Sequence, residues 1–169
     1  MKLQAYVKPR SIAVVGASRD PSKVGHKILK NLIDSGFEGN LYPINPKIPS
    51  LIGRTSYKTI GEVPDDIDLA IISVPAHIVP EVSEQCGRKG VNGIIVISAG
   101  FSETGRDGTI LEKRLFEICK KYNMRMQGPN CLGIVNTKSK TTSNFAKTDP
   151  KNLINPFISI AHNPSSFIL

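Results

Sequence analysis

The chain has 169 residues, of which 40% are hydrophobic and 21% charged, and its formal net charge is +8. This length fits one domain, with room for no more than a fragment of a second, and the composition is that of a globular protein. No apolar run approaches the roughly 20 residues that a membrane-spanning helix needs, and the N-terminus lacks the apolar core of a signal peptide, so we expect a cytoplasmic protein.

The positive charge is compatible with nucleic acid or with a phosphorylated small molecule as the ligand. The lysines do not gather into a block, and they do not alternate with aromatic residues. We therefore expect no nucleic-acid partner. A polyphosphate ligand needs only a few cations at one place, so it fits the sequence better.

The cysteines and histidines do not form a recognisable metal or catalytic set. Cys86, Cys119 and Cys131 are odd in number and widely spaced, which fits neither a disulfide framework nor a zinc site. No two histidines have the helical or hairpin spacing of metal ligands. His26 either donates to a ligand or is an exposed helix histidine. We expect no bound metal and no catalytic constellation within this chain.

Short apolar runs alternate with segments of helical periodicity. The runs are continuous and rich in β-branched residues, which predicts strands buried on both faces of a parallel sheet: 12–15, 41–44, 69–73 and 93–97, with a weaker one at 124–127. Between them, apolar residues recur at helical spacing in 23–36, 76–89 and 108–122. Prolines make 46–66 an irregular connection. This alternation predicts an α/β, Rossmann-like, doubly wound and mostly parallel sheet with helices on both faces.

The pattern weakens after Gly133. Residues 136–156 are polar, and lysines within 138–151 suggest an exposed connection, after which 157–161 resembles one more strand. We expect a ligand-binding domain over 1–146. Residues 147–169 are expected to form a linker and the first strand of a truncated second domain.

Small residues follow the first predicted strand. Gly16, Ala17 and Ser18 leave room for a phosphate to approach backbone N–H groups, and the next helix starts near Lys23, Val24 and Gly25. Ligands of open α/β sheets bind beyond the carboxyl ends of the strands, where helix N-termini attract anions. The two glycines stand nine residues apart, so this is not the G-x-G-x-x-G fingerprint of dinucleotide-binding domains.

The second strand ends in Asn45, Pro46 and Lys47. NAD-binding domains usually carry Asp or Glu here, which accepts hydrogen bonds from the adenine ribose. A cation in its place suits a phosphate on the ribose. The residues leave two ligands open: NADP, with a 2′-phosphate, and coenzyme A, with a 3′-phosphate.

The remaining strands also end in small or flexible residues, over which a long ligand could lie. These residues are Ser73, Val74 and Pro75 after the third strand, Ala99, Gly100 and Phe101 after the fourth, and Asn130 after the fifth.

Taken in order, these loops resemble a known family. The motifs are Gly-Ala-Ser at 16–18, Lys-Val-Gly at 23–25, Asn-Pro-Lys at 45–47, Ser-Val-Pro at 73–75, Ser-Ala-Gly-Phe-Ser-Glu at 98–103 and Gly-Pro-Asn-Cys-Leu-Gly at 128–133. Over about residues 8–146 the chain is similar to the CoA-binding domain of NDP-forming acyl-CoA synthetases. The likeness is greatest to ADP-forming acetyl-CoA synthetases and weaker to the succinyl-CoA synthetase α subunit.

The resemblance implies coenzyme A or acyl-CoA as the ligand and a role for each motif. The segment from Gly16 to Gly25 would hold the pyrophosphate, and Asn45-Pro46-Lys47 would face the ribose and its 3′-phosphate. Ser73-Val74-Pro75 would flank the adenine end. The pantetheine arm would run past Ala99, Gly100, Phe101 and Asn130.

The resemblance also implies what this chain lacks. The family's phosphate-carrying histidine lies beyond the matched region, His162 does not match its motif, and the nucleotide-grasp domain is absent. The chain would therefore be inactive alone and would work with the remaining synthetase domains or a partner subunit. An unpaired final strand is also compatible with a homo-oligomer. Two alternatives stay open: an NAD(P)-binding Rossmann module of an oxidoreductase or redox sensor, and a CoA-responsive regulatory or interaction domain.

Overall fold

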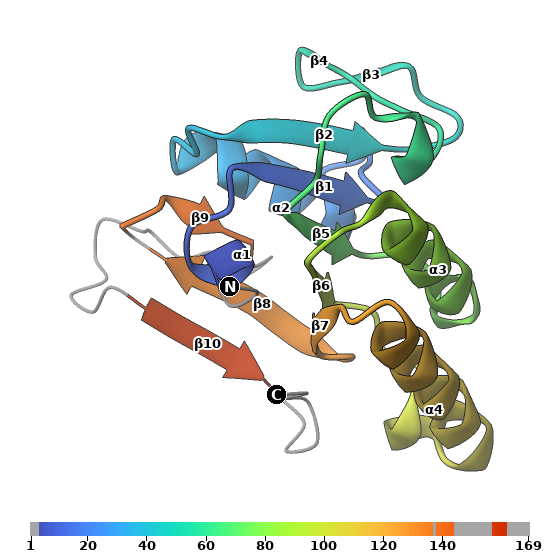
Figure 1. Cartoon of the computed structure of the whole chain (residues 1–169). Coiled ribbons are helices and arrows are strands. Elements are labelled where there is room, and N and C mark those ends of the chain that lie inside the picture. Colours follow the sequence, from blue (N-terminus) through green and yellow to red (C-terminus); the bar gives the residue numbers. More distant parts are fainter. Residues whose placement is uncertain (1–3, 137, 144–156, 162–169) are drawn as a thin grey trace.

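The computed structural model describes residues 4–136, 138–143 and 157–161 (Figure 1). Its centre is a five-stranded sheet in the order β2-β1-β5-β6-β7, and all of its strand pairs are parallel. The strands are β1 (Ser11–Val15), β2 (Asn40–Ile44), β5 (Leu69–Ile72), β6 (Gly93–Val96) and β7 (Arg125–Gln127). The five strands predicted from continuous apolarity are confirmed, as is the parallel Rossmann-like sheet.

Helices cover both faces of this sheet. Helix α2 (Val24–Asp34) lies on one face, and α3 (Val79–Lys89) and α4 (Arg106–Lys121) lie on the other (Figure 1). Successive residues of a strand point to opposite faces, so the sheet contributes to two cores. In β1, Ala13 and Val15 belong to the core that includes residues of α3 and α4, and Ile12 and Val14 to the one that includes residues of α2. The doubly wound prediction is therefore confirmed.

The connection between β2 and β5 is irregular, as its prolines predict. It holds the small hairpin of β3 (Ser50–Leu51) and β4 (Arg54–Thr55), followed by a 3-10 turn at Ile60–Glu62. Two further 3-10 turns precede α3 and α4, at Ala76–Ile78 and Ser102–Thr104. None of the helices among the described residues is long and apolar enough to cross a membrane.

The exposed connection expected over 138–151 is confirmed at Lys138 and Lys140 but is wrong for residues 141–143. Strands β8 (Cys131–Asn136) and β9 (Thr141–Thr142) form an antiparallel sheet with β10 (Phe157–Ala161), in the order β10-β8-β9. Thr141, Thr142 and Ser143 are buried. The polar side chains of this segment suggested that it is exposed. The Ser143 hydroxyl, however, donates to the Ile134 carbonyl at 3.0 Å and accepts from the Ile134 N–H at 2.9 Å, so it is buried with its hydrogen bonds satisfied.

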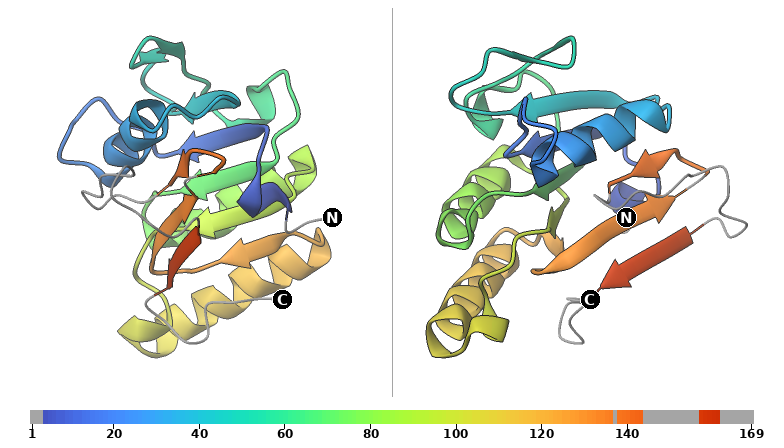
Figure 2. Two further views of the ribbon diagram at one scale, coloured as in Figure 1. Left: turned by 90° about the vertical axis from the view of Figure 1, so that its left-hand side faces the viewer. Right: turned by 180° about the vertical axis from the view of Figure 1, so that it is seen from behind.

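The small sheet lies on the same side of the central sheet as α2 (Figure 2), and Cys131 and Ile134 of β8 share a core with that helix. The strand predicted at 157–161 is present with those bounds and pairs with β8. Residues 144–156 lie outside the described residues. The division into 1–146 and 147–169 therefore stays a prediction.

The N-terminal helix α1 (Gln4–Val7) is fastened to the central sheet by Tyr6. The buried Tyr6 hydroxyl lies between two carbonyl oxygens, those of Ile94 at 3.0 Å and Arg125 at 2.7 Å, and its single proton is shared between them. A Cβ on Gly93 would lie 2.7 Å from the Tyr6 ring, so a glycine is needed under it. Burial raises the pKa of Tyr6 above its ordinary value, so the hydroxyl stays a donor.

Replacing Tyr6 by Phe is expected to lower the free energy of unfolding by about 1–3 kcal/mol, because the buried Ile94 carbonyl and the part-buried Arg125 carbonyl lose the donor that they share. Urea-induced unfolding followed by circular dichroism measures the change. Tyr57→Phe is the control, since in the part of the chain that the structure describes its hydroxyl has no hydrogen-bond partner. Equal stability of Y6F and Y57F would contradict the assigned role.

Candidate functional site

The candidate site lies at the edge where the parallel strands end. The strand order places β1 between β2 and β5, so the chain moves outward in one direction after β1 and in the other after β2. Such a switch point opens a crevice between two neighbouring loops, and it is where open α/β sheets bind ligands. Here those two loops begin with Gly16 and Ser73.

Gly16, Gly25 and Ser73 pack against one another at the switch point. A Cβ on Gly16 would lie 2.6 Å from the Ser73 carbonyl oxygen, and Gly16 has a φ of +87°. A Cβ on Gly25 would lie 2.0 Å from the Gly16 carbonyl oxygen and 3.0 Å from the Ser73 Oγ. Both glycines are needed because backbone meets backbone here. The nine-residue spacing therefore marks where α2 returns to pass over the loop that precedes it.

This contact brings the N-terminus of α2 to the loop. Lys23, the N-cap residue, makes no side-chain hydrogen bond to the helix. The amides of the first turn are thus left without a side-chain acceptor at the cap, beside the small residues Ala17 and Ser18. A helix N-terminus of this kind favours an anion.

Residues 18–26 are held in shape by their own hydrogen bonds. The Asp20 N–H donates to the Ser18 Oγ at 3.1 Å, and the Asp20 carboxylate accepts from the Ser22 N–H and hydroxyl at 2.9 and 2.7 Å. The hydrogen bonds from Ser22 hold the pKa of Asp20 below its ordinary value. His26 is half-buried, and its Nδ1 lies 2.9 Å from the Ser18 carbonyl oxygen. His26 thus stabilises the loop. The sequence analysis had considered it only as a donor to a ligand or as an exposed helix histidine.

Asn45 joins the loops after β1 and β2. Its Nδ2 donates to the Ala17 carbonyl at 2.7 Å, and its Oδ1 accepts from the Lys47 N–H at 2.8 Å. The amide is therefore already engaged within the chain. The adjacent Pro46 and Lys47 are exposed, and the Lys47 side chain forms no ion pair with any described residue.

Sequence reasoning missed Arg19 as a site residue. Its Nη2 donates to the Ser50 carbonyl at 3.4 Å, which carries the guanidinium from the β1 loop to the β2 loop. A second cation thus stands on the side of the site where Lys47 lies. The only signal in the sequence was an arginine inside a loop already predicted to hold phosphate.

The loops after β5, β6 and β7 are linked in the same way. The Ser98 hydroxyl donates to the Val74 carbonyl at 2.5 Å, and the Asn130 N–H donates to the Ser98 carbonyl at 2.9 Å. Asn130 has a φ of +54°, a left-handed conformation that Asn tolerates better than most residues. The ends of all five strands therefore form a continuous rim of hydrogen-bonded loops.

The loop after β6 presents mainly backbone to this rim. Ala99 is exposed, but the Phe101 side chain is fully buried in the core beside α3 and α4, so only its backbone can line a ligand path. The Glu103 carboxylate accepts from the Gly100 N–H at 2.6 Å. Burial raises the pKa of Glu103, but hydrogen bonds from the N–H groups of Gly100, Glu103 and Phe101 outweigh it and leave a lowered pKa.

The cysteines are buried and belong to the core rather than to the site. Burial raises the pKa of Cys86 and Cys119 to about 12 and that of Cys131 to about 11. No group of His, Cys, Asp and Glu side chains in the described ranges could hold a metal ion, and His162 lies outside those ranges.

We expect the native chain to be inert toward Ellman's reagent at pH 8. The pKa of Cys131, the lowest of the three, lies about three units above this pH, so only about 0.1% of that thiol is ionised to the reactive thiolate. All three thiols should react after unfolding in guanidinium chloride. Absorbance at 412 nm counts them. A fast native reaction that disappears in Cys131→Ser would show that the turn at Asn130 opens to solvent.

The comparisons with known proteins agree with this geometry. Residues 10–137 match the family described as the CoA binding domain. The chain belongs to this family. It is 51% identical over 142 residues to the ADP-forming acetate–CoA ligase of Methanocaldococcus jannaschii, covering 84% of this chain and 20% of that protein. It is 46% identical over 153 residues to the α subunit of an ADP-forming acetate–CoA ligase I of Pyrococcus furiosus, covering 88% and 33%.

A solved structure supports the same assignment. The acetyl-coenzyme A synthetase 1 of Candidatus Korarchaeum cryptofilum, in complex with phosphate and ADP, matches with a TM-score of 0.85 and 42% identity, over 88% of this chain and 32% of that one. The family that the loop motifs resemble is thus confirmed. This CoA-binding domain spans about a fifth to a third of the length of these relatives.

Proposed function

We propose that this chain binds coenzyme A along the carboxyl edge of its sheet and serves as the CoA-binding part of an ADP-forming acyl-CoA synthetase. The observation that carries the proposal is the contact of Gly16 with Gly25 at the switch point, next to an unpaired Lys47 where NAD-binding domains have an acid. The family assignment supports the same ligand.

Each part of the edge suits one part of CoA. The pyrophosphate would lie on the Gly16–Ser18 amides and the first turn of α2, between Lys23 and Gly25. Lys47 and Arg19 would face the ribose 3′-phosphate. The adenine end would lie against Ser73, Val74 and Pro75. The pantetheine arm would follow Ala99, Gly100, the Phe101 backbone and Asn130.

These residues bind and orient; they do not transfer groups. In the proposed overall reaction, acyl-CoA, ADP and phosphate are converted to the acid, CoA and ATP. The phosphate-carrying histidine and the nucleotide-grasp domain would come from other domains or from a partner subunit. Both arrangements are reasonable because one relative is named as an α subunit and another extends over a chain about five times the matched length.

Isothermal titration of the purified chain with CoA, dephospho-CoA, NADPH and NAD tests the ligand. Saturable binding of CoA, tighter than that of dephospho-CoA, with no heat from the nicotinamide nucleotides, is the expected result. Binding of NADPH without competition from CoA would overturn the proposal in favour of an NADP-binding module. No response to any of the four would also overturn it and favour an interaction domain.

A further inference from the structure

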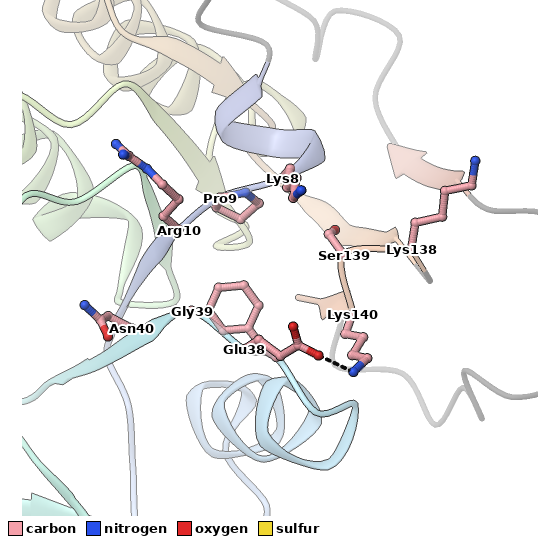
Figure 3. Close-up of a pocket in the computed structure, with 10 residues that line it drawn as sticks. Lys8, Pro9, Arg10, Glu38, Gly39, Asn40, Lys138, Ser139 and Lys140 are labelled. Atoms are coloured by element: carbon pink, nitrogen blue, oxygen red, sulfur yellow. Dashed lines mark hydrogen bonds and ion pairs between the residues drawn. The ribbon is translucent and has the colours of Figure 1, made fainter.

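A second concave surface lies at the opposite edge of the sheet, where the strands begin. Its volume is about 490 Å³, and three segments line it (Figure 3): residues 8–10 before β1, residues 37–40 from the end of the α2–β2 connection to the first residue of β2, and residues 138–140 between β8 and β9. We call it the amino-edge groove. None of the residues assigned to CoA lies in it.

The amino-edge groove is strongly basic. Its lining carries four cations, on Lys8, Arg10, Lys138 and Lys140, and one carboxylate, on Glu38. Glu38 pairs with Lys140 at 2.5 Å. Lys8 and Lys138 form no ion pair with any described residue, and the Arg10 side chain is 87% exposed although its Nε lies 3.4 Å from Asp68. The groove therefore presents a surplus of positive charge to solvent.

The surrounding backbone makes this a poor site for a compact phosphate. Helix α2 ends here, at Asp34, so its carbonyl end is the one that faces the amino edge. A helix C-terminus offers no free N–H groups to cradle a phosphate, in contrast to the N-terminus at the CoA edge, so the attraction for anions here comes from the cationic side chains alone. Flexible cationic side chains on two separate segments, 8–10 and 138–140, suit carboxylates spaced along an extended chain better than one phosphate group.

The groove also has apolar surface. Pro9 and Phe37 line it, and the half-buried Phe37 packs against the core around α2. An apolar floor beneath a cationic rim is typical of a surface that binds protein rather than a small hydrophilic anion.

We propose that the amino-edge groove docks an acidic polypeptide segment from another domain or subunit of the synthetase. Residues 144–169 contain one acidic residue, Asp149, so this segment does not supply the acidic occupant. The docking lies at the far edge from the CoA loops, so both could be occupied together. The identity of the partner rests on the proposed function, whereas the charge preference rests on the groove.

The probe is a fluorescein-labelled 12-residue peptide in which Glu and Asp alternate with Leu, and a matched peptide carries Gln and Asn in their place. Fluorescence anisotropy with the full chain measures its affinity. Lys8→Glu with Lys138→Glu reverses two groove charges that form no ion pair. Lys113→Glu with Arg114→Glu makes the same change of charge on the exposed surface of α4.

The native chain should bind the acidic peptide and not the amide peptide. The groove variant should bind it at least about tenfold more weakly, and the α4 variant should differ from native by less than about twofold. Absence of binding to the native chain, or equal losses in both variants, would overturn the proposal. The proposal would also be overturned if ATP or a 12-nucleotide DNA strand displaced the peptide and bound through the same lysines, because the groove would then prefer phosphates.

Titration with CoA separates this proposal from the proposed function. Both variants should bind CoA as the native chain does, since neither touches the CoA edge. A chain that binds the acidic peptide through the groove but does not bind CoA would refute the proposed function and leave the groove as a docking surface of another assembly.

Discussion

Gly25→Ala is expected to abolish measurable CoA binding and to lower the free energy of unfolding by about 3 kcal/mol. The added methyl group would lie 2.0 Å from the Gly16 carbonyl oxygen and 2.7 Å from its carbon, which are backbone atoms that cannot rotate away. The start of α2 must then move off the loop. Since both the loop and the helix amides belong to the proposed phosphate site, we expect the site to open with it.

Urea unfolding and calorimetric titration with CoA measure the two effects. Gly61→Ala is the matched control, because a Cβ at that exposed position meets nothing closer than the Thr59 Oγ1 at 3.8 Å. It should leave CoA affinity unchanged. A G25A chain that keeps native affinity would show that the contact with Gly16 does not shape the site.

The second large effect is expected for Lys47→Ala. CoA affinity should fall by about tenfold to a hundredfold, because a charge-assisted contact with the 3′-phosphate contributes about 1.5–3 kcal/mol. Dephospho-CoA, which lacks this phosphate, should bind the variant almost as well as it binds the native chain. Stability should not change, since Lys47 is exposed and makes no ion pair with any described residue.

Native and variant chains are titrated with CoA and with dephospho-CoA. The loss of binding free energy caused by the substitution is then compared between the two ligands. Lys113→Ala, on the exposed surface of α4, controls for the loss of one positive charge. Equal weakening of CoA and dephospho-CoA would place Lys47 at the pyrophosphate instead. A loss confined to Arg19→Ala would assign the 3′-phosphate to that guanidinium.

The central sheet could be predicted because each of its strands and helices is recognisable from the pattern of apolar residues within its own segment. Buried parallel strands read as continuous apolar runs, and the helices between them keep a regular apolar stripe. Two strands of the small sheet, β8 and β9, could not be predicted this way. Thr141, Thr142 and Ser143 are polar, and their burial depends on hydrogen bonds with a strand that the sequence pattern did not reveal.

The site was predictable to the level of loops but not of atoms. Gly16 and Gly25 could be singled out from the sequence because both are glycines, one at the end of a strand and one at the start of a helix. Their mutual contact could not, because it depends on how α2 crosses the loop. Asn45 lies at the carboxyl edge, as its position after the second predicted strand indicated, but its amide is engaged within the chain. Phe101 lies in the loop after β6, but its side chain is buried in the core. Side-chain direction depends on packing partners distant in sequence, so residue type alone does not determine it.

The hydrogen bonds that Asp20, Ser22, His26 and Asn45 make within the loops have a thermodynamic consequence. A loop that is ordered before its ligand arrives loses little conformational entropy on binding, so less of the interaction free energy is offset. Two neighbouring loops tied by one amide also respond together. When the first loop holds a ligand phosphate, the second loop would therefore already be in position. The two linked loops would then bind both parts of the ligand as one rigid surface.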